Sequence, residues 1–141
     1  MRQDASVEKA ERASSVRASL MAAGALIVAI NAWAQWGSAE SLRPGFSSGL
    51  WIAMIALWTA VLATGGGLAL GKRMRALLND ELSLRNRARA IAAGFYAMLG
   101  AGLGLYILAW NTQIASGDAV RLIAAAGLAT ALLVYSWLER N

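Results

Sequence analysis

Few residues in this chain are suited to covalent or acid–base chemistry. The sequence has no Cys and no His, which excludes thiolate nucleophiles, the commonest metal ligand and the side chain that titrates nearest to neutral pH. Asp80 and Glu81 are adjacent carboxylates, but neighbours on a helix point in different directions, so a shared base or cation site needs residues from elsewhere. We therefore expect no catalytic residue, no metal site, no cofactor and no enzymatic activity.

Long apolar runs account for most of the sequence. Hydrophobic residues make up 58% and charged residues 15% of the 141 residues, whereas soluble domains are about 45–50% apolar. A helix needs about 20 apolar residues to cross a bilayer core, and four runs approach this length, at about 20–36, 49–70, 90–110 and 119–138. The sequence predicts a single all-α membrane domain over 1–141, built as an antiparallel bundle of four transmembrane helices.

The basic residues give this bundle an orientation. Of the thirteen Lys and Arg residues, all but Arg43 and Arg121 lie in the N-terminal segment 1–19, in the loop 71–89 or at Arg140. With four spans these three regions share one side of the membrane, and cytoplasmic loops carry an excess of Lys and Arg. We expect both termini to be cytoplasmic.

The spans contain few polar side chains. Asn31 is the most polar residue well inside a span, and it is interpreted either as an interhelical hydrogen-bonding residue, which we favour, or as part of a small-ligand site. Trp58 falls near the middle of the second span, away from the interfaces that Trp prefers. Packing in the bundle or against lipid is the favoured interpretation of this ring.

Glycine pairs predict close helix contacts. Gly67 with Gly71 and Gly100 with Gly104 form two G-x-x-x-G motifs, which let helices approach closely in lipid. A phosphate-binding loop is disfavoured, since no strand precedes these glycines and no G-K-[ST] ending follows. The sequence leaves open whether the pairs pack within one bundle or between subunits.

The cytoplasmic connection Lys72–Arg89, KRMRALLNDELSLRNRAR, combines cations with leucines. One interpretation is a loop that sets topology and packs its leucines on the bundle; the other is a docking surface for a cytoplasmic protein. Anionic lipid headgroups are compatible with both, because each nearby cation gains about 1 kcal/mol from them. The candidate partner-binding residues are Arg73, Arg75, Leu78, Asp80, Glu81, Leu82, Arg85, Arg87 and Arg89.

Part of the sequence resembles a family. The resemblance rests on the run from Leu78 to Glu81, the following Arg85-Asn86-Arg87 and the Ala-rich span with Tyr96. The pattern is similar to small four-span bacterial membrane proteins with an L-x-D-E motif between spans two and three. Such proteins are often encoded beside Xre-like helix-turn-helix regulators, and some are thought to restrain the regulator at the membrane. The resemblance implies a bacterial inner-membrane location and a protein partner, and it supplies no catalytic residue.

Three functional hypotheses follow. The first is a regulatory or scaffolding membrane protein that binds a cytoplasmic protein through its basic loop, without direct nucleic-acid binding. The second is an accessory subunit that packs into a larger homo- or hetero-oligomeric membrane complex through its glycine faces. The third is an oligomeric transporter or channel for a small solute.

Overall fold

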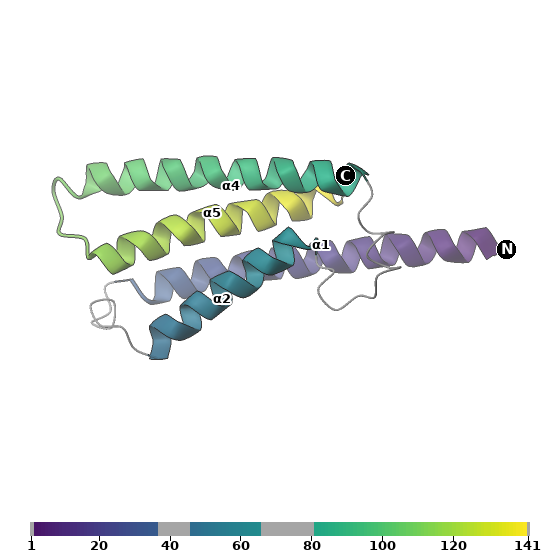
Figure 1. Cartoon of the computed structure of the whole chain (residues 1–141), viewed down its shortest axis with the longest axis horizontal. Helices are drawn as coiled ribbons and strands as arrows, with labels where there is room; N and C mark the ends of the chain where they lie inside the picture. Colours follow the sequence, from purple (N-terminus) through teal and green to yellow (C-terminus); the bar gives the residue numbers. More distant parts are fainter. Residues whose placement is uncertain (1, 37–45, 66–80, 141) are drawn as a thin grey trace.

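The computed structural model of the protein describes residues 2–36, 46–65 and 81–140, and every element in these ranges is a helix (Figure 1). The prediction of an all-α fold is confirmed. The helices are α1 (Arg2–Ala34), α2 (Phe46–Ala63), α4 (Glu81–Leu108) and α5 (Ser116–Leu138).

Three helices are long and apolar enough to cross a membrane. These segments are Ser14–Ala34, Glu81–Leu108 and Ser116–Leu138, with 21, 28 and 23 residues. The apolar helix Ser48–Ala63 is shorter, and the predicted second span 49–70 continues into residues outside the described ranges. Length and composition thus support a membrane protein with three such helices in the described part of the chain.

Two predicted loop regions are helical where they are described. The N-terminal segment 1–19 was separated from the first span in the sequence, yet α1 continues from Arg2 to Ala34 without a break. The third helix begins at Glu81, nine residues before the predicted span, because residues such as Leu82, Arg85 and Arg87 have high helix propensity. The basic end of α4 is therefore helical from Glu81 onward.

Contacts between distant residues fix the helix directions. Ser83 at the start of α4 meets Tyr135 near the end of α5, and Gly94 meets Gly127 further along, so these helices run in opposite directions. Figure 1 shows the chain reversing direction between successive helices, with α5 beside α4 and between α4 and the α1–α2 pair. Most of the packing involves α5, which contacts α4 and α1 extensively and α2 more sparsely.

Small residues line the contact between α1 and α5. On α1 the buried positions recur at alternating intervals of three and four residues, as Ala18, Met21, Ala25, Val28 and Ala32. This spacing places one stripe of a helix against a neighbour, and alanines bring the two backbones close in lipid, where dispersion contacts replace the hydrophobic drive. The stripe explains why α1 and α5 associate closely.

Glycines mark the closest helix approaches. At Gly94 an added Cβ would lie 2.6 Å from the carbonyl oxygen of Gly127 and 2.9 Å from Cβ of Ala131, so α4 and α5 cross backbone to backbone. At Gly24 a Cβ would overlap the indole ring of Trp58. Trp58 therefore packs in the bundle against α1, in agreement with the favoured interpretation of its position.

Candidate functional site

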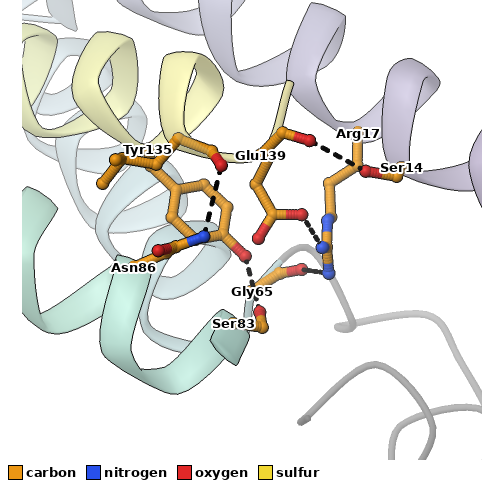
Figure 2. Close-up of polar contacts among 8 residues, drawn as sticks. Ser14, Arg17, Gly65, Ser83, Asn86, Tyr135 and Glu139 are labelled. Atoms are coloured by element: carbon orange, nitrogen blue, oxygen red, sulfur yellow. Dashed lines mark hydrogen bonds and ion pairs between the residues drawn. The ribbon is translucent and has the colours of Figure 1, made fainter. Parts of the chain in front are cut away.

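A cluster of polar residues joins all four helices at the end of the bundle where α5 terminates (Figure 2). This is the end at which α1 enters the bundle, α2 finishes and α4 starts. We call it the Arg17 cluster; its members are Ser14, Arg17, Gly65, Ser83, Asn86, Tyr135 and Glu139.

Arg17 is the centre of the cluster. Its guanidinium forms an ion pair with Glu139, and the two side chains are only 12% and 6% exposed. A second nitrogen of Arg17 donates a 3.4 Å hydrogen bond to the carbonyl oxygen of Gly65, and the guanidinium carbon lies 5.8 Å from the ring centroid of Tyr135. One cation thereby satisfies a buried carboxylate, the C-terminal end of α2 and an aromatic face.

The start of α4 is tied to the end of α5 by two hydrogen bonds. The hydroxyls of Ser83 and Tyr135 lie 3.1 Å apart, and the amide of Asn86 donates to the carbonyl oxygen of Leu138 at 3.3 Å. The bond from Asn86 satisfies one of the carbonyls that a helix leaves unpaired at its C-terminus. These two side chains determine which face of the first turns of α4 points inward.

The outward face of these turns carries basic and apolar side chains. Leu82, Arg85 and Arg89 are exposed, and spacings of three and four residues place them on one helix face. We call these three residues the Arg85 face. Because Ser83 and Asn86 bond to α5, they fix the rotation of α4, and the Arg85 face is presented in a fixed orientation.

Arg87 differs from the other two basic residues of α4. It is half-buried, and its guanidinium donates a hydrogen bond to the carbonyl oxygen of Ala63 at the end of α2. The bond links α4 to α2 across the bundle end. Arg87 is therefore engaged within the chain, in contrast to Arg85 and Arg89.

The structure describes only part of the predicted partner-binding surface. Glu81, Leu82, Arg85 and Arg89 are exposed on α4. The predicted residues that lie outside the described ranges are Arg73, Arg75, Leu78, Asp80, Gly67 and Gly71. No three Asp or Glu side chains within the described ranges gather closely enough to hold a metal ion.

Sequence reasoning missed the residues of the Arg17 cluster. A signal for one pair was present, because Arg17 directly precedes the first apolar run and Glu139 directly follows the last. Because the sequence predicts both termini on one side of a membrane, these opposite charges are expected at the same bundle end. The bonds of Ser83 and Asn86 had no such signal, since they depend on the rotation of α4 about its axis.

Among the described residues, the side chain of Asn31 bonds within its own helix, and the interhelical hydrogen bond stays a prediction. Its side-chain oxygen accepts a 2.7 Å bond from the amide of Gln35, one turn further along α1. Both residues line a cavity of about 260 Å³ with Leu50, Trp51 and Met54 of α2. Nearby in the chain, Ser48 accepts a 3.0 Å bond from the buried Arg121, so this end of α2 is also fastened to α5.

Gly100 and Gly104 lie on an open part of α4. No heavy atom of the described residues lies within 4 Å of a Cβ added at either position. The prediction that this pair packs against another helix stays a prediction, and the described parts of α1, α2 and α5 do not supply the contact.

A scan against protein-family models, a search of curated proteins and a search of solved structures find no match to this chain.

Proposed function

We propose that the protein is a bacterial inner-membrane protein that crosses the bilayer four times and binds a cytoplasmic protein through the basic end of α4. Its role is regulatory or scaffolding, and both termini lie in the cytoplasm. Three membrane-length helices support the membrane placement. The opposite directions of successive helices (Figure 1) support an even number of crossings, with the α1 entry and the α5 terminus at the same end of the bundle.

The orientation rests on charge. The Arg17 cluster places Arg17, Arg140 and the basic start of α4 at the same end of the bundle, since Arg140 donates to Ser19 and Glu139 pairs with Arg17. At the other end the described cation is Arg121, which is buried against Ser48. An excess of cations marks the cytoplasmic side.

The observation that carries the partner proposal is the exposure of the Arg85 face on a helix whose rotation is fixed by the bonds of Ser83 and Asn86 to α5. Leu82 is 65% exposed, and Arg85 and Arg89 follow it along the same face. An apolar side chain beside two cations suits a protein partner with an acidic surface and an apolar contact, because charge complementarity accelerates encounter and selects the partner. The resemblance drawn from the sequence makes a small helix-turn-helix regulator the candidate partner.

The first prediction concerns partner capture. We expect the double variant Arg85→Glu/Arg89→Glu to retain at least tenfold less cytoplasmic partner than the wild type in pull-downs from mild detergent, because two attractive charges become repulsive. Quantitative mass spectrometry of the co-purifying proteins measures this loss. Arg87 is left unchanged because its guanidinium is bonded to Ala63.

Arg140→Glu is the matched control for this experiment. It reverses an exposed cation at the same bundle end without touching α4, so we expect the partner to be retained. An identical set of co-purifying proteins from the wild type, the double variant and the control would exclude the Arg85 face as the docking surface.

The second prediction tests the four crossings. Because the chain contains no Cys, single-cysteine variants can be labelled without background. A membrane-impermeant maleimide added to intact spheroplasts is expected to label Thr112→Cys, in the turn between α4 and α5, and to leave Ser15→Cys and Leu82→Cys unlabelled until the membrane is permeabilised. Labelling of Leu82→Cys from outside, with Ser15→Cys still protected, would mean that α2 does not cross.

An accessory-subunit function has one observation in its favour. The outer face of α4 around Gly100 and Gly104 is open and carries exposed apolar residues such as Leu103 and Ile107. A glycine pair of this kind lets a second membrane helix approach closely. In the pull-down, a membrane protein that co-purifies with wild type and double variant alike would favour this function over the regulatory one.

A further inference from the structure

The described part of the structure contains an apolar groove between α2 and α4, with α5 as its floor. Its volume is about 420 Å³, and of the twelve described residues that line it only Thr59 has a polar side chain. Residues on its walls and floor include Thr59, Ala63, Ile91, Phe95 and Leu128. Phe95 and Ile91 are 56% and 50% exposed, so the groove opens to the surroundings of the bundle.

One end of the groove is basic. Along α4, Ile91, Gly94 and Met98 line the groove, and Arg87 is the preceding position of the same stripe, four residues before Ile91. Its guanidinium bonds to the carbonyl oxygen of Ala63, itself a groove residue. A guanidinium has five donor N–H groups, and this bond uses one of them.

The groove and the basic residue at its end together span about half of the bilayer core. From Arg87, just outside the lining, to Met98, the last residue of α4 that lines the groove, is eleven residues, or about 16 Å of helix. The whole hydrocarbon core is about 30 Å thick. A transmembrane helix of a partner would need a groove along the full bundle, whereas a lipid of one leaflet does not.

We propose that this groove holds an acyl chain of an anionic phospholipid from the cytoplasmic leaflet, with its phosphate against Arg87. The proposal rests on the membrane orientation proposed above, which places Arg87 at the cytoplasmic headgroups. The apolar lining receives the chain, and a fork of donors at the groove's end matches phosphate oxygens. Basic pockets between transmembrane helices on the cytoplasmic side are suited to anionic headgroups.

Lipid titrations monitored by native mass spectrometry test the proposal. Delipidated protein in detergent is titrated with phosphatidylglycerol and with phosphatidylcholine of identical acyl chains. We expect a one-to-one adduct with phosphatidylglycerol, bound more tightly than phosphatidylcholine. Arg87→Gln is expected to weaken the phosphatidylglycerol adduct about fivefold, the factor for one cation beside anionic headgroups, and to leave the phosphatidylcholine adduct nearly unchanged.

Three further variants separate the groove from general effects. Arg89→Gln removes an exposed cation of the same helix that does not belong to the groove stripe, and it should preserve the preference. Arg87→Lys keeps the charge and should preserve most of the preference for phosphatidylglycerol. A preference lost in Arg87→Gln and kept in Arg87→Lys is then due to the charge and not to unfolding. Thr59→Phe fills the groove from α2 and should weaken both lipids several-fold.

Equal effects of Arg87→Gln and Arg89→Gln, or unchanged lipid binding in Thr59→Phe, would overturn the proposal. A wild-type dimer that Thr59→Phe dissociates without altering the lipid adducts would also overturn it, and would assign the groove to a second copy of the chain. The lipid titration contains no protein partner, so the two proposals are tested separately. A negative pull-down would not contradict the lipid site, and a negative lipid titration would not contradict partner binding by the Arg85 face.

Discussion

Gly94→Ala is expected to lower the free energy of unfolding by about 1–2 kcal/mol, whereas Gly102→Ala should raise it by about 0.5–1 kcal/mol. The substitutions are identical and lie on the same helix, yet their expected effects have opposite signs. The difference comes from what the new methyl group meets.

At Gly94 the methyl group meets backbone. Its carbon would lie 2.6 Å from the carbonyl oxygen of Gly127 and 2.9 Å from Cβ of Ala131, and neither atom belongs to the end of a flexible side chain. The two helices must separate, which loses dispersion contacts along α4 and α5, and forced overpacking of this kind costs about 1–3 kcal/mol. The higher helix propensity of Ala offsets only part of this cost.

At Gly102 the methyl group meets a neighbour that needs no displacement. The nearest heavy atom is Cδ1 of Ile123 at 3.8 Å, an ordinary van der Waals distance, so the gain in helix propensity is retained. Unfolding in detergent micelles titrated with SDS measures both free energies. A loss of stability of similar size in both variants would contradict the backbone contact between Gly94 and Gly127.

The sequence predicted the helices better than their contacts. The helical class and three membrane-length segments follow from the length of apolar runs, and the helical start of α4 follows from residues of high helix propensity; both are properties of each segment alone. The G-x-x-x-G search selected Gly100 and Gly104, but the closest approach within the described chain occurs between Gly94 and Gly127. A motif on one helix does not specify the rotation of that helix against its neighbour.

The candidate site shows the same limit. Exposure of Arg85 and Arg89 agrees with a predicted basic surface, but Arg87 between them is turned toward Ala63. Arg85, Arg87 and Arg89 are equivalent in charge, but positions two residues apart differ by about 200° in direction on a helix. Only the hydrogen bonds of Ser83 and Asn86 to α5 show which of these directions faces outward.

The ion pair at the centre of the Arg17 cluster is expected to make the largest single contribution of any polar contact in the described chain. Arg17→Leu should lower the free energy of unfolding by about 3–5 kcal/mol, because it leaves a buried carboxylate without a counter-ion. The side chain of Glu139 is only 6% exposed, so water cannot replace the guanidinium.

The reverse change should cost less. In Glu139→Leu the guanidinium of Arg17 keeps its bond to the carbonyl oxygen of Gly65 and its position over the ring of Tyr135, and these contacts compensate part of the charge. The double variant Arg17→Leu/Glu139→Leu should lose much less stability than the two single losses together. A buried pair replaced by apolar residues removes the desolvation of both charges along with their attraction.

The coupling between the two residues is what identifies a buried pair. Arg140 is an exposed cation at the same bundle end, and it donates a hydrogen bond to Ser19. Its removal in Arg140→Leu is a surface change, and such changes alter stability by only about 0.5 kcal/mol. SDS titrations of the four proteins in the cycle, with Arg140→Leu beside them, give the interaction energy directly. If the losses in Arg17→Leu and Glu139→Leu simply add, the two side chains do not depend on each other. In that case the Arg17–Glu139 pair would not hold the end of α5 against α1. The orientation of the Arg85 face would then depend only on the hydrogen bonds of Ser83 and Asn86 to α5.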